Sequence, residues 1–196
     1  YIHILFFHVI YSSKFLTFDQ QKISYILKAV DMPSIMMDMQ HRWKSIDEIV
    51  SFANRLIDST ISEQNSPYRL EELKEGPSKG GFGQYLENAF FGLETNSRAE
   101  PDFYPIPLEL KATPLKFNAK GDLVPKERLV LNIIDYIETA KETDIYHSHF
   151  LMKNAIILIV WYIHGSALNY SDLKIQMTGL WKCLEEDKDQ IVSDWN

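Results

Sequence analysis

The sequence predicts a single α/β or α+β domain in which a mixed central sheet is flanked by helices. Three observations lead to this prediction: the size and composition of the chain, two segments with helical periodicity, and three apolar segments with strand character. The chain has 196 residues, of which 45% are hydrophobic, and this is enough to bury one core. Helical and strand-like segments together are typical of a sheet covered by helices.

The first helix is predicted from Ser45 to Ile57. Ser45 stands three residues before Glu48, which is the spacing of a capping box at a helix N-terminus. The apolar side chains that follow recur on one helical face. The residues of that face are Ile46, Ile49, Val50, Ala53, Leu56 and Ile57. We therefore expect an amphipathic helix with one side in the core.

A polar segment, residues 62–80, follows this helix and is predicted to be a loop, with a short helical turn at residues 70–73. A second helix is predicted from Gly80 to Gly92. Its apolar residues at helical spacing are Phe82, Leu86, Ala89, Phe90 and Leu93. The glycines at its start lack the lysine and hydroxyl of a phosphate-binding loop, so helix packing is the preferred interpretation.

Three segments have strand character. In residues 106–111, apolar side chains alternate with Pro107, Glu109 and Lys111, so Glu109 and Lys111 share the face opposite the core. The second and third segments, residues 128–134 and 155–163, are apolar enough to lie centrally in a sheet. Gly121 and Asp122 indicate a hairpin turn between the first two strands.

The ends of the chain are predicted separately from the main domain, which we place at residues 45–180. Residues 1–44 are expected to be an N-terminal extension of unknown role. Its first apolar run is too short to span a bilayer, so no transmembrane segment is predicted. Residues 181–196 are expected to start a helical continuation or linker, and they carry no signal that ends a helix.

The overall charge of −7 argues against a protein that coats nucleic acid or anionic membranes without specificity. Residues 111–128 are locally basic, with five basic residues against Asp122 and Glu127. This excess suits a groove that follows DNA phosphates, and it equally suits a solvated hairpin whose lysines block edge pairing. The single cysteine, Cys183, suits the reducing cytoplasm and is expected to be a small apolar residue.

The candidate for chemistry is the group formed by Asp102, Glu109 and Lys111. Two carboxylates beside a lysine make sense if a hard cation lies between the acids, because Mg²⁺ prefers oxygen ligands. Phosphodiester hydrolysis requires such a set. On spacing alone, a surface Glu–Lys pair with an unrelated Asp is the preferred interpretation. His147 and His149 could bind a metal, but exposed loop histidines are the simpler interpretation.

Four segments, taken in order along the chain, change that preference because they resemble the MutH family. The segments are Gly83–Glu87, Ser97–Phe103, Leu108–Pro114 and Lys126–Ile134. The family includes mismatch-repair nicking endonucleases and Sau-type restriction endonucleases that cut at GATC. The third and fourth segments look closer to the Sau-type enzymes. The resemblance covers roughly residues 45–195.

The resemblance implies a PD-(D/E)XK nuclease core and makes residues 45–180 a nuclease catalytic domain. It implies that Asp102 and Glu109 are Mg²⁺ ligands and that Lys111 is the catalytic lysine. Glu87 would be a further acidic ligand at the metal site. Lys153, just before the third strand, matches a family lysine near the active site.

The implied function is a Mg²⁺-dependent type II restriction endonuclease that hydrolyses double-stranded DNA at GATC sites. Two alternatives stay open: a non-catalytic DNA-binding effector module of the same family, and a mismatch-repair endonuclease that nicks one strand. In this family the segment that reads GATC lies beyond the position of Asn196, so we expect a truncated catalytic domain. Self-association, or pairing with a second related domain on DNA, is also implied.

Overall fold

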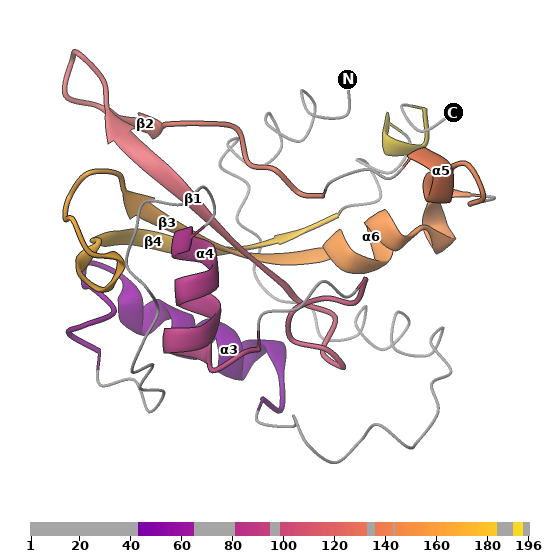
Figure 1. The fold of residues 1–196 in the computed structure, drawn as a ribbon, viewed down its shortest axis with the longest axis horizontal. Helices are drawn as coiled ribbons and strands as arrows, with labels where there is room; N and C mark the ends of the chain where they lie inside the picture. The colour runs from indigo at the N-terminus through magenta and orange to yellow at the C-terminus, as the bar shows by residue number, and fades with distance from the viewer. Residues whose placement is uncertain are drawn as a thin grey trace.

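The computed structural model describes residues 43–64, 81–94, 99–132, 136–142, 144–183 and 190–193. The predicted extension at residues 1–44 therefore lies almost wholly outside the described residues, as does most of the loop at residues 62–80 with its helical turn. The described residues form a four-stranded mixed sheet with helices (Figure 1). The predicted α+β class, with helices around a mixed sheet, is confirmed. None of the helices that the structure describes is long and apolar enough to cross a membrane.

The sheet has the strand order β2-β1-β3-β4. Its strands are β1 Glu109–Phe117, β2 Leu123–Pro125, β3 Ile156–Ile163 and β4 Ile175–Lys182. β1 and β3 run parallel, whereas β2 pairs antiparallel with β1 and β4 pairs antiparallel with β3. The central position predicted for the third apolar segment is confirmed, because residues 156–161 are all buried. Both faces of β3 are covered, so its side chains need not alternate between apolar and polar.

The second predicted strand, residues 128–134, is wrong over the part that the structure describes, because residues 128–132 form no strand. The hairpin partner of β1 is β2, which follows the turn directly and pairs Leu123 with Phe117. After the turn, Val130 is 54% exposed and Leu131 is buried, in an irregular segment. Side chains that alternate between exposed and buried give the sequence pattern of a strand, although this segment pairs with no other strand that the structure describes.

β4 was not predicted, and the helical continuation expected from Trp181 is wrong at residues 181–182, which end this strand. Residues 190–193 are helical, as expected, and residues 184–189 lie outside the described part. β4 contains Gly179, which weakens its strand signal in the sequence. Pairing along the whole of β3 overrides that weak local preference, because strand formation depends strongly on neighbouring strands.

The first predicted helix is confirmed as α3 Ile46–Ala53, which continues into the 3₁₀ turn η2 Asn54–Leu56. The Ser45 hydroxyl accepts a hydrogen bond from the Glu48 backbone N–H at 3.2 Å. The Glu48 carboxylate in turn accepts from the Lys44 N–H at 2.9 Å. The cap therefore satisfies one backbone donor of the first turn, and the Glu48 carboxylate satisfies the N–H of the residue before the cap.

The second predicted helix is confirmed from Gly81 onward, in two parts. α4 spans Gly81–Tyr85 and continues into the π-helix η3, Leu86–Phe91. Gly92 ends this helix in the left-handed conformation, with φ of 67°, and its N–H donates to the Glu87 carbonyl. π-helical turns are rare, and those that occur within helices frequently lie at functional sites.

Four short helical segments complete the described fold. They are α5 Tyr136–Thr139, η4 Ile145–His147, α6 His149–Asn154 and η5 Tyr170–Asp172. Ser148 caps α6, since its hydroxyl accepts from the Leu151 N–H at 3.1 Å. α6 leads directly into β3, so the last turn of this helix lies at the start of a buried central strand.

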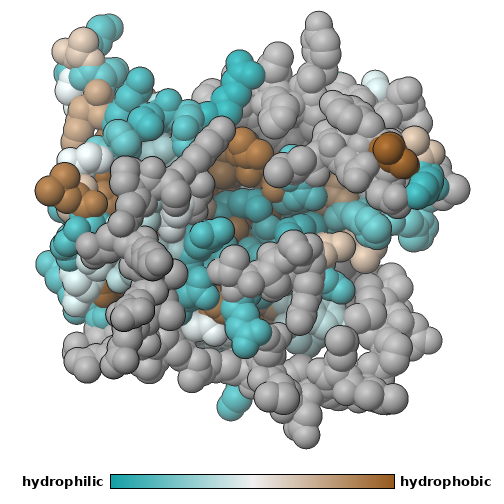
Figure 2. Space-filling view, viewed as in Figure 1, coloured by the Kyte–Doolittle hydropathy of each residue, from teal (hydrophilic) through white to brown (hydrophobic). Residues whose placement is uncertain are grey.

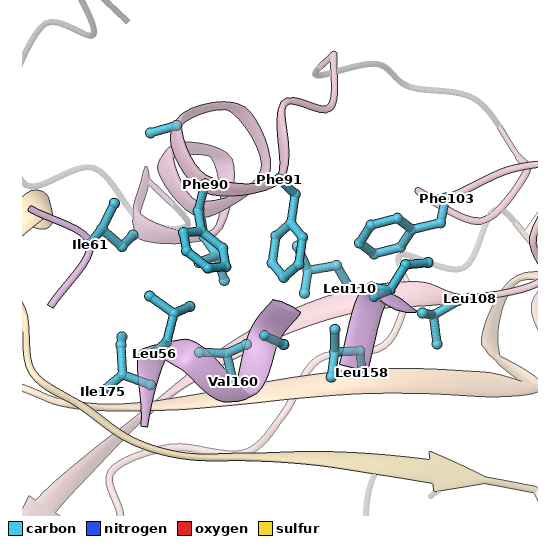
Figure 3. Close-up of a cluster of buried hydrophobic side chains, with 14 of the residues drawn as sticks. Leu56, Ile61, Phe90, Phe91, Phe103, Leu108, Leu110, Leu158, Val160 and Ile175 are labelled. Carbon is cyan, nitrogen blue, oxygen red and sulfur yellow. The ribbon is translucent and has the colours of Figure 1, made fainter. Parts of the chain in front are cut away.

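Two hydrophobic clusters lie on opposite faces of the sheet. The first joins α3, α4 and η3 to one face, where Leu158 and Val160 point (Figure 3). Its aromatic centre is tightly packed, with the ring centroids of Phe90 and Phe91 5.0 Å apart. The second cluster contains Leu115, Leu131, Ile145, Ile157, Ile159, Trp161 and Ile191. Cys183 packs half-buried against this second cluster, as its apolar character predicts.

Candidate active site

The predicted acids and lysine meet where β1 begins. Asp102 lies in the loop before β1, and Glu109 and Lys111 are the first and third residues of this strand. Alternate residues of a strand point to the same face, so the side chains of Glu109 and Lys111 lie together. β2 pairs only with residues 115–117 of β1, and within the described residues no strand covers the first half of β1 on that side.

Reciprocal hydrogen bonds hold the two carboxylates beside each other. The backbone N–H of Asp102 donates to Glu109 Oε2 at 3.2 Å. The backbone N–H of Leu110 donates to Asp102 Oδ2 at 2.9 Å. The loop is closed by a third bond, from the Phe103 N–H to the Leu108 carbonyl at 3.1 Å. The backbone thus brings two acids together in spite of their mutual repulsion.

Two lysines approach the same oxygen of Glu109. Lys111 Nζ donates to Glu109 Oε1 at 2.6 Å, and Lys153 Nζ lies 3.7 Å from this oxygen. The Glu109 residue is 1% exposed, whereas the side chains of both lysines are 19% exposed. Lys153 comes from the last turn of α6, so β1 and α6 together form the charged group.

Burial raises the pKa of Glu109 to about 7, and the negative charge of Asp102 acts in the same direction. The charge of Lys111 and its hydrogen bond, together with the charge of Lys153, oppose this rise. The two ammonium groups therefore do not fully compensate the removal of this carboxylate from water.

Glu87, on η3, faces the same group of charges. Burial raises its pKa to about 7, and repulsion by Asp102 and Glu109 adds to the effect. The charges of Lys111 and Lys153 lower it in part. Glu87 is thus within electrostatic range of the other four predicted site residues, although the five come from a helix, a loop, a strand and a second helix.

The carboxylates of the site are the kind of oxygen ligand that Mg²⁺, the cation implied by the family resemblance, prefers. Within the described residues, no group of three or more His, Cys, Asp or Glu side chains is placed to hold a metal ion. Asp102 and Glu109 form an adjacent pair, and Mg²⁺ is commonly bound through one or two carboxylates, with waters and substrate phosphates as the other ligands. A cation between the two acids would also relieve the repulsion that raises the pKa of Glu109. The pair fits Mg²⁺, and Glu87 as a third ligand stays a prediction.

The two histidines noted in the sequence lie apart from this chemistry. Both are exposed, and His147 Nδ1 is 2.9 Å from Asp144 Oδ2. This hydrogen bond holds the pKa of Asp144 below its usual value. His149 Nδ1 lies 3.7 Å from Glu142. The simpler interpretation is right that both histidines are exposed, but they lie in the short helices η4 and α6 and not in a loop.

The sequence analysis missed Asn154, which connects the site to the segment after β2. Asn154 is 1% exposed, and its Nδ2 donates to the Phe150 carbonyl at 2.8 Å and to Asn132 Oδ1 at 3.2 Å. It directly follows Lys153 and so holds the end of α6 that carries this lysine. The sequence signal that could have identified Asn154 is its position just before the long apolar run of β3. An amide that is buried there requires hydrogen-bond partners.

Comparisons with known proteins identify the family of the chain. The family described as DNA mismatch repair enzyme MutH matches residues 91–194, which is more than half of the chain. The matched range contains Asp102, Glu109, Lys111 and Lys153.

Two known proteins are similar to the chain. The type II restriction enzyme Sau3AI of Staphylococcus aureus is 42% identical over 92 residues, which are 47% of this chain and 18% of that enzyme. The DNA mismatch repair protein MutH of Shewanella woodyi is 28% identical over 164 residues, which are 81% of this chain and 67% of that protein. The chain thus matches less than a fifth of the length of the restriction enzyme.

Proposed function

The chain belongs to the MutH family of DNA mismatch repair enzymes, and from this premise we propose that it is a site-specific DNA endonuclease. The reaction is hydrolysis of phosphodiester bonds at GATC sites in double-stranded DNA, with Mg²⁺ as the cation. The observation that carries the proposal is the contact set of Asp102, Glu109 and Lys111 at the start of β1. A surface Glu–Lys pair with an unrelated Asp would not have this connected geometry.

The residues of the chain can divide the chemistry as follows. Asp102 and Glu109 would hold Mg²⁺, which when bound polarises a phosphoryl oxygen and makes a bound water more acidic. Lys111, next to Glu109, can orient the attacking water or stabilise the negative charge that develops on the phosphate. Lys153 adds a second positive charge on the same side. Glu87 contributes a further carboxylate that faces the pair.

We assign the catalytic domain to residues 45–180 and its core to the PD-(D/E)XK type. The support is the position of the acids: one precedes a central strand, and the second opens the strand two residues before the lysine. β3 then lies parallel to β1 and places the end of α6 beside the carboxylates. The sheet therefore carries Glu109 and Lys111, whereas the loop before β1, η3 and α6 supply Asp102, Glu87 and Lys153.

Restriction cleavage is favoured over strand nicking by the similarity to Sau3AI, which is 42% identical over the aligned part. The second candidate is a mismatch-repair endonuclease that nicks one strand. It is supported by the longer alignment with the MutH protein, which spans 81% of this chain. The two activities leave different products on the same substrate, so one experiment separates them.

The experiment is cleavage of supercoiled plasmid DNA that carries several GATC sites, in methylated and unmethylated forms, with Mg²⁺ or with EDTA. Asp102→Asn is the informative variant, because asparagine keeps an oxygen for the Leu110 N–H but removes the charge. Glu100→Gln, at an exposed position, is the matched control.

Fragments that end at GATC, and that disappear with EDTA and with Asp102→Asn, are the expected result. Nicked circles as the only product would support the mismatch-repair candidate. DNA binding without any cleavage by the unmodified protein would refute the catalytic proposal and leave the effector module.

A further inference from the structure

We propose that the hairpin of β1 and β2 is an arm that binds DNA phosphates outside the catalytic site. The arm consists of residues 115–128, that is, the end of β1, the turn, β2 and the segment that follows. The inference rests on the proposed endonuclease function and adds to it a second, non-catalytic contact with the duplex. Figure 1 shows that the hairpin extends from the rest of the sheet at the upper left.

One strand connects the arm to the active site. Lys111 lies near the start of β1, and Phe117 is its last residue. Six residues of strand cover about 20 Å, at roughly 3.3 Å per residue. Along DNA this distance corresponds to about six base pairs, at roughly 3.4 Å each. A duplex that runs along β1 with its cleaved phosphate at Lys111 would therefore meet the arm about half a helical turn away.

The turn at the tip of the arm is held in one shape by Asn118. Its side-chain oxygen accepts from the backbone N–H groups of Lys120 at 2.8 Å and Asp122 at 2.9 Å. Gly121 adopts φ of 85°, which a residue with a side chain rarely does. Because the turn is already ordered, little conformational freedom would be lost when a ligand binds it.

The charge of the arm is opposite to that of the whole protein. Its basic residues, all exposed, are Lys116, Lys120, Lys126 and Arg128. Its acids are Glu127 and Asp122, and Asn118 Nδ2 donates to the Asp122 carboxylate at 3.1 Å. In a chain with a net charge of −7, a polyanion is attracted to this region. Figure 2 shows hydrophilic residues on the hairpin at the upper left, with hydrophobic residues among them.

The other explanation of these lysines, protection of a sheet edge, fits the structure less well. β2, which is the edge strand, consists of Leu123, Val124 and Pro125 and carries no charge. Pro125 has no N–H to offer a neighbouring chain and already limits edge pairing. The lysines stand before and after β2. Phe117 is 60% exposed beside them, an apolar surface that could pack against the sugars of a nucleic acid.

The test is DNA binding by a variant with Lys116→Ala, Lys120→Ala and Lys126→Ala. The control variant carries Lys44→Ala, Lys141→Ala and Lys174→Ala, which removes the same charge from exposed positions elsewhere. Both triple variants are made in the Asp102→Asn background, so that binding is measured by fluorescence anisotropy without cleavage. The duplexes, of about 30 and about 8 base pairs, are centred on one GATC site, and the shorter one ends before Lys116, the first lysine of the arm.

On the long duplex, the arm variant should bind about tenfold more weakly than its parent at about 0.1 M salt. The slope of log K against log salt should decrease in magnitude by about 2 to 3, for up to three lost phosphate contacts. The short duplex should show no difference. A triple Lys→Gln variant at the same positions provides the answer if the alanine variant does not fold.

An unchanged salt slope on the long duplex, or an equal loss of affinity in the control variant, would refute the proposal that the arm binds DNA. In both cases the parent still binds DNA and the unmodified protein still cleaves it, so the proposed function stands. If the parent itself does not bind and the unmodified protein does not cleave, the proposed function fails together with the arm.

Discussion

Glu87→Gln should stabilise the metal-free protein at alkaline pH and have little effect at acidic pH. Burial and the charges of Asp102 and Glu109 raise the pKa of Glu87 from 4.5 to about 7, so folding favours its protonated form. The stabilisation from this bound proton is fully present below pH 4.5. It is lost as the pH rises through about 7, because the carboxylate must then ionise beside two other acids.

The magnitude follows from the two pKa values. The difference between 4.5 and about 7 corresponds to about 3 kcal/mol. Glu87 is only half-buried, and solvent screening reduces this to about 1–2 kcal/mol. At pH 8, glutamine removes the ionised group, and we expect the free energy of unfolding to rise by that amount. For a chain of this size, the melting temperature should increase by about 2–8 °C.

The assay is urea unfolding in the presence of EDTA at pH 5 and at pH 8, followed by circular dichroism. Glu100→Gln, at an exposed position, should behave like the unmodified protein at both values and serves as the control. The reasoning is refuted if Glu87→Gln is less stable than the unmodified protein at pH 8. An equal gain at both pH values would also refute it, because the gain would then not depend on ionisation.

Three further substitutions test single contacts by urea unfolding. Phe90→Ala should cost about 3–5 kcal/mol, since the ring is fully buried and lies 4.4 Å from that of Phe52; a loss below about 1 kcal/mol would contradict this packing. Asn154→Ala should cost about 1–3 kcal/mol by leaving Asn132 without its amide donor, and should slow plasmid cleavage, whereas unchanged cleavage would show that Lys153 needs no such support. Ser45→Ala should cost about 1 kcal/mol, and Ser45→Asp should restore most of it if the cap is the cause.

Local chemistry is enough to predict the elements whose signals lie close together in the chain. The serine and glutamate at the start of α3 are three residues apart, so the cap could be recognised without knowledge of the fold. The long apolar run of β3 likewise predicts a central strand. The pairing of Glu109 with Lys111 follows from the alternation of side chains along any extended segment, and the structure confirms it.

The tertiary structure decided which extended segments became strands and which charges met. Residues 128–132 and β4 have similar local preferences, but only β4 finds a long partner in β3, and hydrogen bonding to that partner is what makes it a strand. The proximity of Glu87 and Lys153 to the carboxylates also depends on how η3 and α6 pack. Spacing along a chain cannot report such distances, because they arise only when separate elements pack around the same sheet.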